Sequence, residues 1–174
     1  GVSSAIYTGT LGNGDKYFYG TAYNDNGTYV SFDHINTITY YMGLGNDNLS
    51  IDGNGMATAG NALYVNGGGG IDSLNANFGV VTTGFTITDS SISTTNITAA
   101  NFEVLSLTLG SGNDTVTLTG AAGDSIQLGL GSDSVSVTNA TGYQSFDGGA
   151  GAGLNTLSVN NGVQSNGVNS AIYT

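Results

Sequence analysis

The stretch Gly110-Ser111-Gly112-Asn113-Asp114-Thr115-Val116 joins two runs, 104–109 and 116–118, in which apolar and polar residues alternate. Glycine suits a tight turn because it adopts backbone angles that other residues avoid, and alternation with a period of two is typical of half-buried β-strands. Elsewhere Gly, Ser, Thr, Asn and β-branched residues interrupt every window of helical length. Further alternating runs occur at 85–88, 126–128, 135–137 and 157–159. The sequence therefore predicts an all-β protein.

The same turn, of the form G-x-G-x-(Asp or Asn)-x-apolar, occurs five times. Its acidic or amide position falls at Asp47, Asp72, Asp114, Asp133 and Asn155, so the successive intervals in the numbering are 25, 42, 19 and 22. We interpret the interval of 42 as two steps of about 20 each. Regular short strands of this kind favour a parallel β-solenoid, a β-roll or β-helix, with about 20 residues per coil. A β-sandwich is the alternative.

Two longer repeats indicate how the chain is organised. Residues 18–51 align without a gap onto 85–118, an offset of 67, and residues 1–8 differ from 167–174 at one position of eight. We therefore expect residues 1–166 to form one repeat unit with two related halves. Residues 167–174 are then the start of the following unit or, alternatively, a terminal edge strand of similar design.

The composition excludes several classes of function. Among 174 residues there are 12 acidic side chains and a single basic one, Lys16, so the formal net charge is −11. Such a chain cannot neutralise phosphates, which argues against nucleic acid as a partner. It has no cysteine for disulfides or thiolate metal sites. No stretch reaches the roughly 18 apolar residues of a membrane helix, so we expect no membrane insertion.

The repeated turns carry the chemistry of a calcium site. Calcium takes six to eight oxygen ligands, and a glycine turn followed by Asp offers backbone carbonyls beside a carboxylate. One turn supplies too few ligands, so we expect sites between stacked turns: Asp47 with Asp72, Asp114 with Asp133, and Asp133 with Asn155. Bound cations would also relieve repulsion between the carboxylates. The predicted metal-binding positions are Asp47, Asp72, Asp114, Asp133 and Asn155, with the turn glycines Gly45, Gly70, Gly112 and Gly131. The alternative is that these Gly-Asn-Asp turns merely end strands.

These turns resemble the RTX (repeat-in-toxin) nonapeptide family, GGxGxDxUx. The run 101–116 is also similar to linking repeats of large bacterial surface proteins, adhesins and S-layer-like proteins with hemolysin-type calcium-binding motifs. The resemblance covers roughly 35–75 and 85–159. It implies a parallel β-roll, secretion to the bacterial cell surface, and folding coupled to extracellular calcium. This chain departs from the family because its motifs are scattered rather than contiguous and because Asn155 occupies the last acidic position.

The remaining features give little support to catalysis. The chain holds one His, one Glu and one Lys and neither Arg nor Cys; we expect His34 to be a turn residue and Glu103 a solvated or edge residue. The Tyr-rich segment 17–30 predicts two strands around an Asn-Gly turn. Together with Tyr40 and Tyr41 it is a candidate sugar-stacking patch or subunit contact, with core filling or an end cap as the alternative.

The sequence thus predicts a non-enzymatic, extracellular, calcium-stabilised repeat that serves as a spacer, sheath or filament segment. Its expected partners are neighbouring copies of itself, joined in tandem or stacked end to end through exposed sheet edges. The alternative is an adhesin module that binds a glycan or a protein through the Tyr-rich surface.

Overall fold

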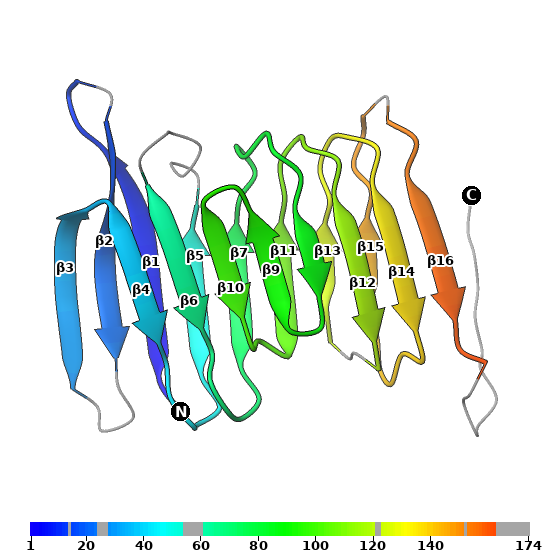
Figure 1. The fold of residues 1–174 in the computed structure, drawn as a ribbon, viewed down its shortest axis with the longest axis horizontal. Helices are drawn as coiled ribbons and strands as arrows, with labels where there is room; N and C mark the ends of the chain where they lie inside the picture. The colour runs from blue at the N-terminus through cyan, green and yellow to red at the C-terminus, as the bar shows by residue number, and fades with distance from the viewer. Residues whose placement is uncertain (14, 24–27, 54–60, 121–122, 152, 163–174) are drawn as a thin grey trace.

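The computed structural model describes residues 1–13, 15–23, 28–53, 61–120, 123–151 and 153–162. These residues form 16 β-strands in two eight-stranded sheets and no helix, which confirms the predicted all-β class. Accordingly, no helix in these ranges could cross a membrane. The two sheets pack face to face around one apolar core (Figure 1).

The sheets are named A and B here. From one edge to the other, sheet A contains β3 (Tyr29–Ile35), β2 (Lys16–Tyr23), β1 (Ser3–Thr10), β5 (Asn48–Asp52), β7 (Ser73–Asn77), β11 (Val104–Thr108), β13 (Ser125–Gln127) and β15 (Ser145–Asp147). In the same direction, sheet B contains β4 (Thr37–Tyr41), β6 (Ala62–Asn66), β10 (Ile97–Ala100), β9 (Ser91–Thr94), β8 (Thr86–Thr88), β12 (Thr115–Thr119), β14 (Ser134–Thr138) and β16 (Thr156–Asn160).

For most of its length the chain crosses from one sheet to the other after every strand, from β3 to β8 and again from β10 to β16. From β4 to β7 and from β11 to β16, each strand pairs in parallel with the strand two crossings away. Ile38 thus pairs with Leu63, Ser106 with Ser125, and Val135 with Leu157. These partners are separated by the same intervals as the repeated turns, so the spacing of the turns is also the spacing of neighbouring parallel strands.

Two antiparallel meanders interrupt this regular succession, and the sequence interpretation did not foresee them as such. Strands β1, β2 and β3 form one in sheet A, and β8, β9 and β10 form the other in sheet B. Strands β2 and β3 confirm the two strands predicted in the Tyr-rich segment, while Asn26 and Gly27 of the predicted turn lie outside the described residues. Each meander adds strands to one sheet only.

Alternation along the strands builds the core. In β12 the side chains of Val116 and Leu118 are buried, whereas the threonines between them face outward. Phe78 and Phe85 stack inside with ring centroids 5.2 Å apart. Burying one such large apolar side chain contributes about 1.5 to 3 kcal/mol. Because the core continues along the whole length of the two sheets, the turns between them lie along its two long edges.

Candidate functional site

The five repeated turns lie on two opposite edges of the double sheet. The turns that end at Asp47 and Asp72 lead from sheet B to sheet A, at the lower edge in Figure 1. Those that end at Asp114, Asp133 and Asn155 lead from sheet A to sheet B, at the upper edge. The interpretation of the interval from Asp72 to Asp114 as two coils is therefore wrong, because these two residues belong to different edges. The three predicted neighbour pairs each share an edge.

On the upper edge, backbone hydrogen bonds join the acidic positions into a ladder. The Asp133 N–H donates to Asn155 Oδ1 over 2.9 Å, the Asp114 N–H to Asp133 Oδ1 over 2.9 Å, and the Phe85 N–H to Asp114 Oδ1 over 2.7 Å. The backbone carbonyls of Asp114 and Asp133 in turn accept from Ser134 and Thr156. At the point where the chain turns, each carboxylate or amide oxygen thus takes the place of a backbone carbonyl as the acceptor of a backbone N–H from the neighbouring turn.

The lower edge carries a second ladder of the same kind. The Val2 N–H donates to Asp47 Oδ1 and the Asp47 N–H to Asp72 Oδ1, both over 2.7 Å. Glu103 continues it, because its Oε2 accepts the Asp72 N–H over 2.8 Å. Beyond Glu103, Asp124 Oδ1 accepts the Leu105 N–H over 2.9 Å. Glu103 is exposed, as expected of an edge residue, yet it also completes this ladder.

The turn glycines allow successive turns to stack closely. Gly70 and Gly131 have φ of 132° and 140°, and a Cβ at either would clash with the carbonyl oxygen of Gly45 or Gly112 in the neighbouring turn. Gly112 does not have positive φ; it is required because a Cβ there would meet the backbone of Gly84. The carbonyl oxygens of one turn therefore lie directly against the backbone of the next.

The aspartate side chains of the repeated turns are buried, whereas charged carboxylates normally stay in contact with water. Asp47, Asp114 and Asp133 are at most 2% exposed, and Oδ2 of each is buried without a hydrogen-bond partner. Burial raises the pKa of Asp114 from 3.8 to about 6; the hydrogen bond from Phe85 lowers it and the charge of Asp133 raises it further. Burial likewise raises the pKa of Asp124, against the hydrogen bond from Leu105, and the Asp89 charge adds to the rise. An unpaired buried carboxylate oxygen is costly unless it takes a proton or a cation.

The donor set fits a hard cation in kind, since every available ligand is a carboxylate, amide or carbonyl oxygen. The carboxylates are spread along the ladders, and within the described residues no three Asp, Glu, His or Cys side chains gather at one point. A cation between two turns would therefore take most of its ligands from backbone carbonyls. Asp114 with Asp133 and Asp47 with Asp72 are the pairs that would hold it.

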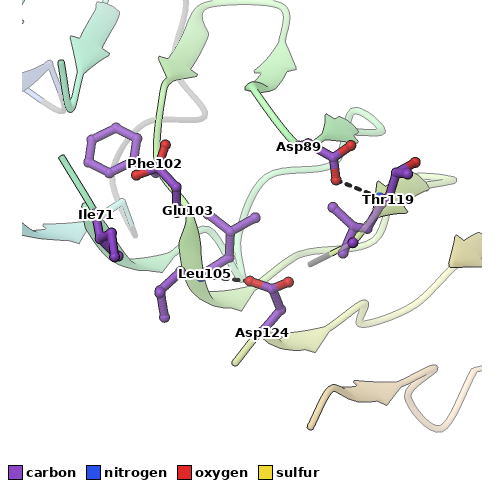
Figure 2. Close-up of a pocket in the computed structure, with 10 residues that line it drawn as sticks. Ile71, Asp89, Phe102, Glu103, Leu105, Thr119 and Asp124 are labelled. Carbon is purple, nitrogen blue, oxygen red and sulfur yellow. Dashed lines mark hydrogen bonds between the residues drawn. The ribbon is translucent and has the colours of Figure 1, made fainter. Parts of the chain in front are cut away.

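A separate recess of about 350 Å³ opens where the β8–β9 hairpin meets the start of β11 (Figure 2). Phe102 and Leu105 form part of its apolar wall, and Asp89, Glu103 and Asp124 bring carboxylates to it. These three are already engaged as acceptors, since Asp89 Oδ1 binds the Thr119 N–H over 2.7 Å and the other two belong to the lower ladder. The carboxylates in this recess therefore act as acceptors for backbone N–H groups.

Aromatic side chains gather on the outer face of the first meander. Tyr7 stacks on Tyr19 with ring centroids 5.4 Å apart, and Tyr17 stacks on His34 at 4.2 Å. The other tyrosines considered with this segment lie elsewhere. Tyr40 is half-buried and donates its hydroxyl to the Tyr23 carbonyl over 2.6 Å, as expected for core filling, and Tyr41 contacts Tyr64 on sheet B.

Sequence reasoning missed three members of the ladders. Val2 and Phe85 contribute only backbone N–H groups, which no side-chain pattern reveals, and Glu103 lies outside any G-x-G turn. Asp124 lies in a degenerate sixth copy of the turn, at 120–126, which the sequence shows although Asp124 is not among the predicted metal-binding positions. Comparison with protein-family models, curated proteins and solved structures finds no match to this chain.

Proposed function

We propose that this protein is a structural β-solenoid repeat, stabilised by calcium, that acts as an extracellular spacer, sheath or filament segment of a bacterial surface protein. Support for the solenoid comes from the crossing between sheets after nearly every strand, with parallel partners separated by the intervals of the repeated turns. Sandwiches of the antiparallel kind instead join neighbouring strands within a sheet or by Greek-key connections. Eight strands at about 4.8 Å spacing span about 34 Å, which suits a rod-like segment.

The observation that carries the calcium proposal is the buried, unpartnered Oδ2 of Asp47, Asp114 and Asp133. With a net charge of −11 and one lysine, the chain has almost no cations of its own to neutralise these groups. Calcium would supply a divalent charge and accept oxygen ligands only. The ladder residues would hold the carboxylate oxygens in place, because each Oδ1 is fixed by a backbone N–H of the neighbouring turn.

Thermal unfolding with calcium, with magnesium and with chelator tests this proposal. Calcium at about 100 times its dissociation constant stabilises a native state by about 2.7 kcal/mol, which corresponds to roughly 5 to 11 °C for a chain of this size. Magnesium, which demands near-ideal octahedral geometry, should give a smaller shift. Equal melting temperatures in calcium and in chelator would refute the calcium proposal and leave the solenoid standing.

The extracellular location is tested separately, by antibody labelling of intact cells of the source organism. Labelling that appears only after the cells are opened would contradict it. An enzymatic role is not proposed, because the recess in Figure 2 is lined by carboxylates that already accept backbone N–H groups.

A second candidate function, glycan binding, is favoured by the stacked tyrosines on the first meander. Tyr7 and Tyr19 are about 40% exposed and lie on the outer face, where flat aromatic rings suit the apolar face of a sugar. Binding to a glycan array that is lost in Tyr19→Ala and kept in Tyr143→Ala, an exposed tyrosine on a distant loop, would support this role. Failure of the wild-type chain to bind any glycan would remove it.

A further inference from the structure

Both ends of the double sheet leave core positions uncovered. In the described part of the chain, β3 and β4 form the edges at one end and β15 and β16 at the other, the left and right ends of Figure 1. Val30 is 66% exposed on β3, and Leu157 and Val159 are 63% and 55% exposed on β16. A recess of about 420 Å³ between β3 and β4 is lined by Val30, Phe32, Ile38 and Tyr40 among others. Each end thus shows apolar side chains that a further pair of strands would bury.

In the middle of the molecule, two such strands are covered, because two later strands of the chain pair with them. There β6 and β7, which precede the second meander, pair in parallel with β10 and β11, which end it. In sheet B Val65 lies opposite Ala99, and in sheet A Leu74 lies opposite Leu105. All four are at most 3% exposed. This internal junction joins the end of one run of strands to the beginning of the next.

The strands at the β3/β4 end correspond to one side of this junction. Strand β4 (Thr37–Tyr41) and β11 (Val104–Thr108) have the same length at an offset of 67. The segments before them match as well, because His34, near the end of β3, and Asn101, just after β10, are related by the same offset and have φ of 57° and 55°. Such values are uncommon for residues other than glycine. Strands β3 and β4 therefore present the pairing edges that β10 and β11 present internally.

The strands at the β15/β16 end correspond to the other side. An offset of 83 in the numbering relates the start of β6 to the start of β15, and β7 (Ser73–Asn77) to β16 (Thr156–Asn160). The same offset relates Gly70 to Gly153, Asp72 to Asn155, Leu74 to Leu157 and Asn77 to Asn160. The equivalent side chains of Leu74 and Leu157 differ in cover, since the first is 1% and the second 63% exposed.

We infer that the β15/β16 end of one copy of this chain binds the β3/β4 end of a second copy, in the register of the internal junction. Applying the two offsets places Leu157 opposite Ile38 and Ser158 opposite Thr39 of the second copy, with β15 pairing in parallel with β3. This inference rests on the proposed structural role and gives it a geometry. The interface is heterologous, so a third copy adds in the same way and the assembly grows as a filament.

The sequence is consistent with the same arrangement along one chain. The chain that leaves β7 enters the second meander at Phe85, whose N–H joins the upper ladder and which lies 13 positions after Asp72 (85 − 72). Val168 likewise lies 13 positions after Asn155 (168 − 155), so the offset of 83 relates Phe85 to Val168 as it relates Asp72 to Asn155. Val168 is also the residue that repeats Val2, which directly precedes the first meander. The second copy can therefore be a separate chain or a following unit of the same sequence, since both would offer the same edges.

Engineered disulfides test the register, and the chain has no cysteine of its own to interfere. Thr39→Cys and Ser158→Cys are made separately at exposed, outward-facing positions. They are mixed under mild oxidation, and the disulfide is identified by mass spectrometry. Paired strands bring such Cα atoms to about 4.8 Å, within the range of a disulfide.

The matched control mixes Thr39→Cys with Thr156→Cys, two residues out of register, where the Cα atoms would be about 8 Å apart and a disulfide cannot form. A 39–158 disulfide at least ten times more abundant than 39–156 is the expected result; equal amounts, or none, would overturn the register.

Sedimentation velocity tests the surface itself. Leu157→Asp should abolish concentration-dependent assembly without lowering the melting temperature, because Leu157 is exposed in the single copy. Val80→Asp, a comparable change at a 45% exposed residue of the β7–β8 loop, away from both ends of the double sheet, is the control and should assemble like the wild type. A wild-type chain that stays monomeric at its highest soluble concentration would refute the inference. Because both experiments are run in calcium and in chelator, assembly with no calcium effect on melting would refute the calcium proposal and not this one.

Discussion

Replacing Asp114 by Asn separates the stability that the buried carboxylate costs the fold from the calcium binding that it could contribute. In the folded chain Asp114 is 1% exposed and its pKa is raised from 3.8 to about 6. Below about pH 4 the group is protonated in the folded and unfolded states alike and adds no pH dependence. Between about pH 4 and 6 the unfolded state loses its proton first, so stability falls as the pH rises, and above 6 the full penalty is present. The difference of about 2.2 in pKa corresponds to at most about 3 kcal/mol.

Asparagine keeps the Oδ1 that accepts the Phe85 N–H and removes the charge, as Asn155 does at the end of the same ladder. In chelator at pH 7 we therefore expect Asp114→Asn to melt higher than the wild type, by up to roughly 6 to 12 °C. The difference should vanish at pH 4. Differential scanning calorimetry across this pH range is the measurement. Asp33→Asn is the control, because Asp33 also accepts a backbone N–H but is 64% exposed, and it should change little.

Calcium should reduce the difference in melting temperature between the two proteins or reverse it. If Asp114 is a ligand, the wild type gains more stability from calcium than Asp114→Asn does. Equal calcium-induced shifts would remove Asp114 from the metal site. A variant that melts lower than the wild type in chelator at pH 7 would refute the argument from burial altogether.

Three further outcomes follow from the turns and the core. Gly131→Ala should lose at least about 1 to 3 kcal/mol in chemical denaturation, because φ of 140° and the contact with Gly112 O both oppose a Cβ, whereas Gly12→Ala, with open space around it, should be neutral. Leu74→Ala should cost about 2 to 5 kcal/mol and the equivalent Leu157→Ala less than about 0.5 kcal/mol in the monomer, since only Leu74 is buried; similar losses would show that the end is covered. Glu103→Ala should cost about 0.5 to 1.5 kcal/mol by removing the acceptor of the Asp72 N–H, and Glu103→Gln, which keeps an acceptor oxygen, should restore most of it by the same measurement.

Much of the fold could be predicted from local pattern because alternation and glycine spacing act within single strands and turns. The runs around Val104, Val116, Val135 and Leu157 each became a strand at about the expected place. The meanders were harder to predict, since whether a strand such as β9 turns back within its sheet or crosses to the other depends on pairing with distant strands. No local signal distinguishes the two outcomes.

The candidate site shows the same division between local and distant information. The regular intervals between the turns correctly brought Asp47 to Asp72 and Asp114 to Asp133 and Asn155. The step from Asp72 to Asp114 misled, because it includes the second meander and ends on the opposite edge. Glu103 was beyond prediction for a related reason: it replaces an aspartate in the lower ladder only because the meander brings β11 beside β7.

The two meanders also give the two halves of this chain opposite excesses of strands. Strands β1 to β7 place five strands in sheet A and two in sheet B, whereas β8 to β16 place three in A and six in B. Either half alone would leave one sheet three strands wider than the other, an overhang of about 14 Å. A row of such halves of one kind would increase the overhang with every copy, so the sheets could not stay paired across the core. Because the second meander lies in the opposite sheet, the two excesses cancel and both sheets end after eight strands. A unit that contains one meander must therefore contain the other as well if it is to repeat head to tail without shearing one sheet past the other.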